Sequence, residues 1–361
     1  MKTGFLLIVL AFFGLVGYVT WHLYRITPGD RVPKLVVGGL FLLWMVAAFS
    51  CMFLRNRLPY PAVVALYEVG QPWLIAFAYL LIAFVLADIA MLCKLLPKAC
   101  FNGNLTAMLS IFGAVAIVMG AGGIHYKHKY REELTIKTGK PLDQQHVKVV
   151  LASDLHIGYS NRKAELARWI DMINDEHPDL VLFGGDIVDI KTEPLFDGNY
   201  AEEFRRLTAP AYAVLGNHEY IAGAEDSERF LAEAGITLLK NSVVNFKGID
   251  IIGRDDRSNP CRLALWEFAD SLEGFTILLD HQPSHLEDAQ DAGIDFQFSG
   301  HTHRGQAWPL SWLTDAIFEK SWGPYQKGNT QYYISSGLGI WGPKIRIGTR
   351  SEYLVLNILN K

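Results

Sequence analysis

The chain has 361 residues, of which 50% are hydrophobic and 19% are charged, and its formal net charge is −4. This composition excludes a disordered chain, because disordered chains are poor in apolar residues and rich in charge. Four cysteines in a chain of this length exclude a small disulfide-stapled domain and leave the redox compartment open. At about 150 residues per domain, the length allows two domains.

Charge divides the chain into two parts. Residues 1–124 contain eight Lys and Arg against three Asp and Glu, a net charge of +5, whereas residues 125–361 have a net charge of −9. A basic, apolar front followed by an acidic back half predicts a membrane region joined to a water-soluble domain. The acidic half also argues against nucleic acid as a partner, because a phosphate backbone is usually met by a basic surface.

Four apolar stretches predict transmembrane helices, at residues 4–24, 35–54, 73–93 and 105–124. Each has about 20 residues, the length that a helix needs to cross the hydrocarbon core of a bilayer. Basic residues collect between the stretches and aromatic residues lie near their ends, as is typical of membrane interfaces. Asp88 is the one acidic residue inside a stretch, which makes it a candidate for transport or proton relay; an interfacial or structural role is the alternative.

The two ends of a chain with four spans lie on the same side of the membrane. Cytoplasmic ends would place six basic residues inside and five outside, so the positive-inside rule weakly favours a cytoplasmic soluble domain. The basic run HYKHKYR at residues 125–131 favours the same orientation. We expect residues 1–124 to form the transmembrane domain, residues 125–145 a polar juxtamembrane connector, and residues 146–361 the soluble domain.

In the soluble half, short apolar runs alternate with helical patterns. Strands are predicted at residues 147–153, 180–183, 212–215, 237–240, 242–246, 249–253, 275–279, 296–299, 331–336 and 352–358. Helices are predicted at residues 161–176, 200–207, 224–234, 263–272 and 284–292. This alternation indicates a layered α/β fold, and the later hairpins indicate a second sheet. In such folds functional residues collect at the carboxyl ends of the strands.

Five of the predicted strands end in residues that ligate metals. The candidates are Asp154, His156, Asp186, Asn217, His281, His301 and His303. Each motif is weak alone, but together they place nitrogen and oxygen donors without cysteine, a set that suits Mn²⁺, Fe²⁺ or Zn²⁺. Seven ligands are too many for one tetrahedral site, so we expect two divalent metal ions about 3.5–4 Å apart, with Asp186 between them.

The motifs D-x-H, G-D-x-x-D, G-N-H-E, a later His and G-H-x-H follow one another in residues 147–361. In this order they resemble the calcineurin-like metallophosphoesterase family. The resemblance implies a four-layered α/β sandwich of two sheets, preceded here by a bundle of four transmembrane helices. It implies one metal held by Asp154, His156, Asp186 and His303, and a second held by Asp186, Asn217, His281 and His301. It also implies that His218 is catalytic and faces the phosphate without binding metal.

Two further motifs, G-H-T-H-x-G-Q and the tail S-S-G-L-G followed by P-K-I-R, resemble a bacterial, often membrane-attached branch of this family. That branch includes UDP-diacylglucosamine hydrolases. The resemblance implies an enzyme of the bacterial inner membrane. Arg304 stands where many members of the branch have glycine. We expect it to bind substrate phosphate together with Asn217; a surface arginine is the alternative.

The resemblance implies a metal-dependent phosphoesterase in which a hydroxide between the two metals attacks phosphorus. His218 would stabilise the developing charge or protonate the leaving oxygen. Asp189 and Glu219 are candidates for orienting histidine ligands, with solvated carboxylates as the alternative.

The four-helix anchor favours an amphiphilic phosphodiester or pyrophosphate at the bilayer surface as substrate. Aromatic residues in the expected loop 308–325 would contact its acyl chain or the interface, or would pack on their own domain. One rival hypothesis is a nucleotide phosphodiesterase or nuclease, which the charge of −9 disfavours. Another is a membrane sensor or transport protein with a binding-only domain, which the full ligand set disfavours.

Overall fold

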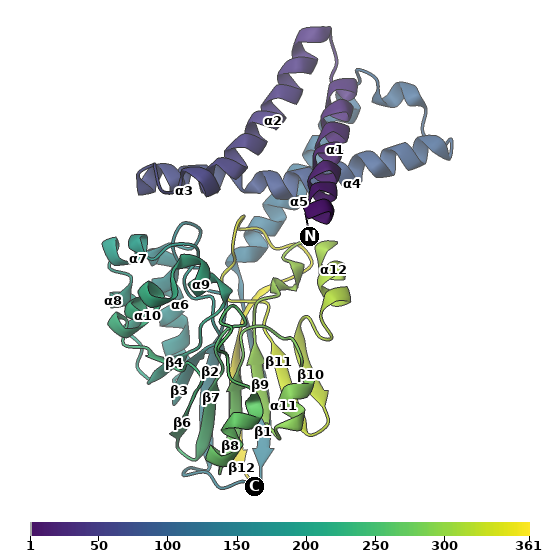
Figure 1. The fold of residues 1–361 in the computed structure, drawn as a ribbon. Helices are drawn as coiled ribbons and strands as arrows, with labels where there is room; N and C mark the ends of the chain where they lie inside the picture. The colour runs from purple at the N-terminus through teal and green to yellow at the C-terminus, as the bar shows by residue number, and fades with distance from the viewer. Residues whose placement is uncertain (1) are drawn as a thin grey trace. The chain divides into compact units, whose positions relative to one another are not determined.

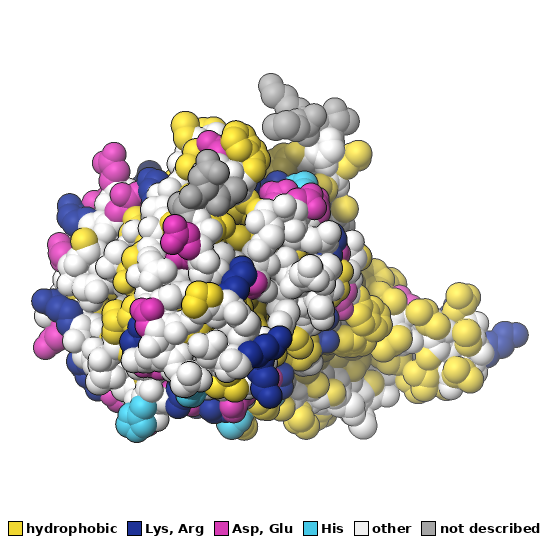
Figure 2. All heavy atoms as spheres, turned by 90° about the horizontal axis from the view of Figure 1, so that it is seen from below, with side chains coloured by type: hydrophobic (Ala, Val, Ile, Leu, Met, Phe, Trp, Pro, Cys, Tyr) yellow, Lys and Arg dark blue, Asp and Glu magenta, His cyan; other side chains and the backbone are white. Residues whose placement is uncertain are grey.

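The computed structural model describes residues 2–361 and divides into two compact units, Met1–Ile124 and His125–Lys361. The first unit consists of helices, and the second of two β-sheets with helices on their outer faces (Figure 1). Hydrophobic side chains cover the apolar helices, whereas acidic and basic side chains intermingle over the second unit (Figure 2).

The first unit contains four stretches that are long and apolar enough to cross a membrane. Its helices are α1 (Lys2–Ile26), α2 (Arg31–Leu54), α3 (Tyr60–Gly70), α4 (Pro72–Leu92) and α5 (Leu105–Lys127), with a short 3₁₀ helix at Lys98–Phe101. The candidate spans are Gly4–Ile26, Arg31–Leu54, Tyr60–Leu92 and Leu105–Lys127. By length and composition, the chain is therefore a candidate multi-pass membrane protein.

The third apolar stretch begins earlier than expected. Helical structure starts at Tyr60 and runs through α3 and α4 with one residue, Gln71, between them, whereas we expected the span at residues 73–93. Pro72 separates the two helices because it lacks an N–H group. A side chain at Gly70 would lie 2.8 Å from the backbone of Ala47, so glycine permits the close contact between α3 and α2.

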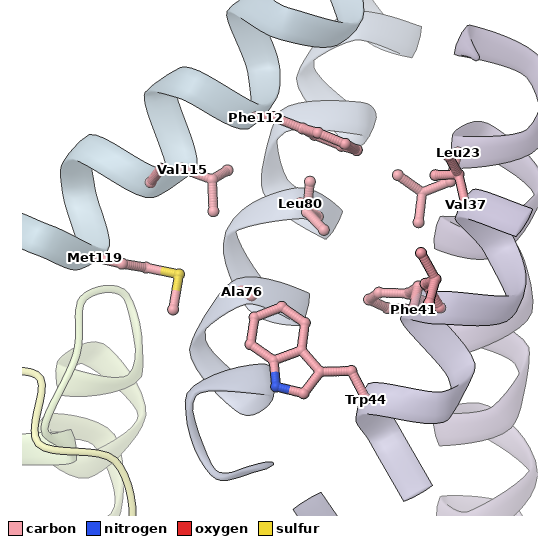
Figure 3. Close-up of a pocket in the computed structure, with 11 residues that line it drawn as sticks. Leu23, Val37, Phe41, Trp44, Ala76, Leu80, Phe112, Val115 and Met119 are labelled. Atoms are coloured by element: carbon pink, nitrogen blue, oxygen red, sulfur yellow. The ribbon is translucent and has the colours of Figure 1, made fainter. Parts of the chain in front are cut away.

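A cavity of about 360 Å³ lies between α1, α2, α4 and α5 (Figure 3). Its lining is Leu23, Val37, Leu40, Phe41, Trp44, Ala76, Leu80, Phe112, Val115, Ala116 and Met119. The indole N–H of Trp44 donates to the Val69 carbonyl at 2.6 Å. The wall is therefore apolar and suits hydrocarbon rather than a polar ligand.

The first sheet of the second unit has the strand order β1-β12-β2-β3-β4-β5. Its strands are β1 (Lys129–Thr138), β2 (His146–Ala152), β3 (Leu180–Phe183), β4 (Ala211–Ala213), β5 (Thr237–Leu238) and β12 (Ser351–Asn360). β12 is antiparallel to β2, and the other neighbours are parallel. The carboxyl ends of β2, β3 and β4 therefore meet at one edge.

The second sheet has the order β10-β11-β9-β8-β7-β6. Its strands are β6 (Ser242–Phe246), β7 (Ile249–Gly253), β8 (Phe275–Leu279), β9 (Phe296–Ser299), β10 (Gly323–Lys327) and β11 (Thr330–Ile334). The central strands β7, β8, β9 and β11 are parallel, and the edge strands β6 and β10 are antiparallel to their neighbours.

The two sheets pack face to face, and strand alternation explains the layers. In β2, Val149 and Leu151 join the cluster between the sheets, whereas Val150 and Ala152 join the cluster under the outer helices. Those helices are α6 (Lys163–Asp175), α7 (Glu193–Asp197), α8 (Ala201–Phe204) and α10 (Ala224–Glu233) on the first sheet, and α11 (Glu287–Asp291) with the 3₁₀ helix Leu265–Ser271 on the second. The predicted four-layered α/β sandwich of two sheets, preceded by long apolar helices, is confirmed.

The expected connector at residues 125–145 is not a simple linker. It contains β1, which pairs in parallel with all ten residues of β12, from Lys129 beside Ser351 to Thr138 beside Asn360. β1 is an edge strand in which every second residue from Arg131 to Lys137 is exposed, and three of these four residues are charged. The sequence pattern hid it because its strand character depends on a partner more than 200 residues later.

The expected loop at residues 308–325 is also partly regular. It contains α12 (Leu310–Ile317) and the start of β10. α12 has only eight residues, too few for its helical period to stand out in the sequence, and it exposes Trp312, Leu313 and Ile317.

Candidate metal centre

The candidate metal centre lies at the carboxyl ends of the parallel strands. Asp154 follows β2, Asp186 follows β3, His281 follows β8 and His301 follows β9 within a few residues of each strand end. α9 (Asn217–Ala222) begins a few residues after β4 and carries Asn217 and His218. Loops at one edge of two packed sheets thus bring together residues that are far apart in the sequence.

Asp154, His156 and His303 form the first group of donor atoms. The Nε2 atoms of His156 and His303 are 3.1 Å apart, and Asp154 Oδ1 lies 3.5 Å from His303 Nε2 and 3.9 Å from His156 Nε2. The His156 ring is fully buried. Two imidazole nitrogens and a carboxylate oxygen therefore face a common point.

Asp186, His281 and His301 form the second group. The Nδ1 of His281 lies 2.8 Å from the Gly184 carbonyl, which makes Nδ1 the protonated nitrogen and leaves Nε2 for a ligand. The two groups meet at Asp186, whose Oδ2 lies 3.1 Å from His281 Nε2 and 3.7 Å from His156 Nε2. One carboxylate oxygen thus adjoins both groups.

Three of the four histidines of the centre, His156, His301 and His303, are held in the neutral form that binds metals. Burial, with further effects from neighbouring imidazoles, lowers the pKa of His156 and His303 well below the ordinary value and that of His301 to about 4. Burial lowers the pKa of His281 as well, but Asp186 and Asp154 outweigh it and raise that pKa. Burial raises the pKa of Asp154 to about 6. For Asp186 burial acts in the same direction, but the imidazoles of His281 and its neighbours outweigh it and lower the pKa.

The donor set fits two divalent cations. Asn217 Oδ1 is buried and accepts no hydrogen bond from any residue that the structure describes. A buried carbonyl oxygen without a partner is costly, and a cation would satisfy it. Four imidazoles, two carboxylates and an amide oxygen suit Mn²⁺, Fe²⁺ or Zn²⁺.

The backbone of the centre is strained at its candidate ligands. Positive φ angles occur at Asp154 (56°), His156 (44°), Asp186 (52°), His301 (71°) and His303 (46°). Residues with a side chain disfavour this left-handed region, and each such residue costs about 1–3 kcal/mol. Strain repeated at five candidate ligands indicates that the surrounding fold stabilises a geometry needed for function.

Two glycines allow the loops to approach the carboxylates. A Cβ on Gly216 would collide with Asp186 Oδ1, and one on Gly300 would collide with Asp154 Oδ2. The glycines of the G-N-H-E and G-H-x-H motifs therefore serve close approach of backbone to ligand.

His218 lies beside the first group with its ring centre 4.4 Å from that of His156. The ring Nδ1 of His218 is 2.8 Å from the Asp189 carbonyl and 3.4 Å from Asp189 Oδ1. The backbone N–H of His218 donates to Asp186 Oδ1 at 2.8 Å. Burial lowers the pKa of His218, but Asp189 and Asp186 outweigh it and raise the pKa to about 9. The ring therefore holds a proton at neutral pH.

Asp189 and Glu219 have different roles. Asp189 lies beside His218, and its Oδ1 is 3.8 Å from His156 Nδ1, as expected for a carboxylate that orients histidines. Glu219 was expected to do the same, but it binds backbone instead: it accepts the N–H groups of Asp186 at 3.0 Å, Val188 at 2.8 Å and Gly216 at 2.7 Å. It therefore shapes the loop that presents Asp186.

Arg304 lies in the turn after His303 with its guanidinium 4.2 Å from the ring centre of Trp322. Stacking of this kind keeps an arginine in place without neutralising its charge. Its contact with substrate phosphate stays a prediction.

Sequence reasoning gave no role to Arg346, although the residue was noted in the P-K-I-R motif. The side chain is fully buried and donates to the carbonyls of His303 at 2.8 Å, Ser336 at 2.6 Å and Gly339 at 3.0 Å. Burial lowers its pKa to about 10, so it stays charged at neutral pH. It links the backbone of His303 to the glycine-rich tail by hydrogen bonds. Only the folded structure reveals this role, because the bonded residues are distant in the sequence.

Sequence comparisons agree with this geometry. The family profile for calcineurin-like phosphoesterases matches residues 147–305. An uncharacterized metallophosphoesterase of Aquifex aeolicus is 30% identical over 260 residues, covering 68% of this chain and 98% of that protein. A transmembrane protein with metallophosphoesterase domain of Danio rerio is 30% identical over 236 residues, covering 60% of this chain and 53% of that protein.

An uncharacterized metallophosphoesterase of Helicobacter pylori is 34% identical over 230 residues, which are 61% of each chain. This chain thus matches about three fifths of the length of that relative. The prediction of the family is confirmed by the profile and by the Aquifex relative, which is matched over nearly its whole length. The chain belongs to the calcineurin-like metallophosphoesterase family.

Proposed function

We propose that this chain is a membrane-anchored phosphoesterase that uses two divalent metal ions to hydrolyse an amphiphilic phosphodiester or pyrophosphate. The observation that carries the proposal is the position of Asp186 Oδ2, which adjoins the imidazoles of both donor groups. When bound, two cations neutralise phosphate oxygens and lower the pKa of a water molecule towards neutrality.

The residues of the chain bind and orient the substrate. Asn217 offers its amide and Arg304 its guanidinium to phosphate oxygens. The Nδ1 side of His218 is taken by Asp189, so Nε2–H is the group that donates to the phosphate or to the leaving oxygen. Because Asp186 and Asp189 keep this ring protonated at neutral pH, His218 is suited to act as general acid.

Apolar residues next to the site support an amphiphilic substrate. α12 follows the His303 turn after a few residues and exposes Trp312 by 65%, Leu313 by 57% and Ile317 by 64%. Phe318, at the end of this helix, has its ring centre 6.1 Å from that of His301. An acyl chain attached to a bound phosphoester would cover this apolar surface.

The experiment compares substrates and metals with the full chain in nanodiscs. Hydrolysis of bis-p-nitrophenyl phosphate and of a UDP-linked acyl sugar is measured with Mn²⁺, after chelation, and after Mn²⁺, Fe²⁺ or Zn²⁺ is restored. We expect activity that disappears on chelation and returns with metal, and a higher kcat/KM for the acylated substrate. Equal kcat/KM for both substrates would contradict the amphiphilic class, and bound metal without turnover of any phosphoester would favour a binding-only domain.

We also propose an inner-membrane location with the second unit on the cytoplasmic side. Cys261 is an exposed cysteine of that unit and serves as a probe once Cys51, Cys93 and Cys100 are replaced by serine. A membrane-impermeant maleimide should label Cys261 only after spheroplasts are lysed. Labelling of intact spheroplasts would place the second unit outside.

A further inference from the structure

The last turn of α5 belongs to the second unit, although the rest of the helix is a candidate membrane span. His125 Nε2 lies 3.0 Å from the carbonyl of Thr349. Tyr126 is almost fully buried, and its hydroxyl donates to Asn161 Oδ1 at 2.6 Å. Only His128 lies between the end of α5 and the start of β1.

Asn161 is fully buried and uses both ends of its amide. Its Nδ2 donates to the carbonyls of Leu155 and Ile340, each at 2.8 Å, and reaches that of His156 at 3.2 Å. Its Oδ1 accepts from Tyr126. A flipped amide would turn its oxygen towards these carbonyl oxygens, so the carbonyls fix the orientation of the amide. The hydroxyl of Tyr126 then satisfies the buried Oδ1 and holds the amide in place.

One of the carbonyls that Asn161 reaches belongs to the candidate ligand His156, and that of Leu155 lies between the candidate ligands Asp154 and His156. His156 supplies an Nε2 to the first donor group and has a left-handed backbone with φ of 44°. Ile340 follows Gly339, whose N–H donates to the Asp154 carbonyl at 3.1 Å. A strained conformation persists only where the surroundings hold it in place, and Asn161 supplies part of that support.

The ring of Tyr126 is itself fixed by Lys129 at the start of β1. The Lys129 Nζ donates to the Tyr126 carbonyl at 3.0 Å and lies 3.7 Å from the centre of the Tyr126 ring. The same nitrogen is 5.2 Å from the ring centre of Trp169 in α6. The hydroxyl of Tyr126 is therefore presented to Asn161 by a ring that neighbouring side chains hold.

We infer that Tyr126 is a positioning residue of the metal site: through Asn161 it holds the backbone of His156, which makes the end of α5 part of the metal-binding machinery. The inference rests on the proposed function, since it concerns the affinity of that site for a divalent ion. Groups behind metal ligands typically change metal affinity by about 10–100-fold when they are removed.

The test measures binding of Mn²⁺ to the full chain in nanodiscs by electron paramagnetic resonance of the free ion. Tyr126→Phe keeps the ring and removes the hydroxyl, and we expect affinity about tenfold weaker. Tyr332→Phe is the matched control, because Tyr332 is equally buried and donates to the Leu286 carbonyl at the same distance of 2.6 Å. We expect this control to keep the wild-type affinity and to lose a similar amount of thermal stability.

Two further variants separate the possible results. Lys129→Met removes the hydrogen bond from Nζ to the Tyr126 carbonyl and keeps the hydroxyl of Tyr126, and should weaken Mn²⁺ binding by about threefold. In an Asn161→Ala background, Tyr126→Phe should have no added effect on affinity, because the hydroxyl acts through the amide.

Equal Mn²⁺ affinity of wild type, Tyr126→Phe and Lys129→Met would overturn the inference while leaving the proposed function intact. Equal losses for Tyr126→Phe and Tyr332→Phe would also overturn it, because they would reflect stability alone. If Tyr126→Phe does not fold, wild-type affinity of Lys129→Met decides against the inference. Absence of bound metal in the wild type would contradict the proposed function first, so the two failures are distinguishable.

Discussion

Buried polar groups are distributed differently in the two units. The difference distinguishes polar residues buried for helix packing from polar residues buried at a candidate site. In the described part of the first unit they are His22, Thr27 and Gln71. Thr27 Oγ1 donates to the Leu23 carbonyl within its own helix, and Gln71 Nε2 donates to Ala48 of a neighbouring helix. These bonds satisfy groups that hydrocarbon surroundings would otherwise leave unpaired.

The second unit concentrates its buried polar groups at one edge of its sheets. Asp154, His156, Asp186, His281 and His303 are all buried there, with a backbone strained at four of them. A fold that needed only stability would not collect carboxylates and unpaired donors in this way. Polar burial therefore marks helix packing in the first unit and the candidate metal centre in the second.

The largest effect should come from the carboxylate that both donor groups share. Asp186→Asn removes the charge with little change of shape, and we expect hydrolysis of bis-p-nitrophenyl phosphate to fall about 10³-fold, a loss of about 4 kcal/mol. The matched control is Asp179→Asn, a partly exposed carboxylate that pairs with Lys247 at 2.7 Å. Steady-state rates measured with saturating Mn²⁺ test this prediction. A loss of tenfold or less would contradict the role of Asp186 as the carboxylate shared by both donor groups.

A smaller effect, on the stability of the whole second unit, is expected at Arg346. Arg346→Met leaves three buried carbonyls without their charged donor, so the free energy of unfolding of the second unit should fall by about 3 kcal/mol. Arg229→Met is the control, because Arg229 is exposed, pairs with Asp226 at the surface and has its guanidinium 4.4 Å from the ring centre of Phe196, contacts that contribute little to stability. Thermal unfolding followed by near-ultraviolet circular dichroism measures the difference, and equal stability of both variants would refute the role assigned to Arg346.

The third effect, smaller than that at Arg346, concerns substrate selection and is expected from the exposed face of α12. Trp312→Ser should raise KM for an acylated substrate by about fivefold, the value of a few tens of Å² of apolar contact. It should leave the KM for bis-p-nitrophenyl phosphate unchanged. Trp266→Ser is the control, since Trp266 is similarly exposed on the 3₁₀ helix of the second sheet. A rise in KM for both substrates, or for neither, would argue against an acyl-binding role.

The smallest effect should occur inside the first unit. Asp88 Oδ2 accepts the hydroxyl of Tyr18 at 2.6 Å and lies 3.0 Å from His22 Nε2, so it joins α4 to α1. Asp88→Asn keeps an acceptor of the same size, and we expect a loss of under about 1 kcal/mol in stability with unchanged hydrolysis. Activity assays and thermal unfolding in nanodiscs test this; a collapse of activity would give the first unit a chemical role and break the contrast.

The comparison also shows which features local sequence patterns reveal. Apolar length predicted the candidate spans, and strand-end motifs predicted the donor residues, because hydropathy and strand periodicity are local properties. The start of the third span at Tyr60 was missed because Glu68 and two prolines interrupt its apolar pattern. β1 and α12 were missed because β1 is rich in charge and α12 has only eight residues.

By itself, the sequence determined the division into an apolar front and an α/β back half, the family, and the residue types of the metal centre. Only the tertiary structure decided that Asp186 Oδ2 adjoins both donor groups, that Glu219 holds backbone rather than histidine, and that Arg346 and Asn161 support the ligands. The physical reason is the range of the interactions. Hydropathy and strand patterns are set by neighbours along the chain, whereas a hydrogen bond such as that from Tyr126 to Asn161 depends on how distant loops meet.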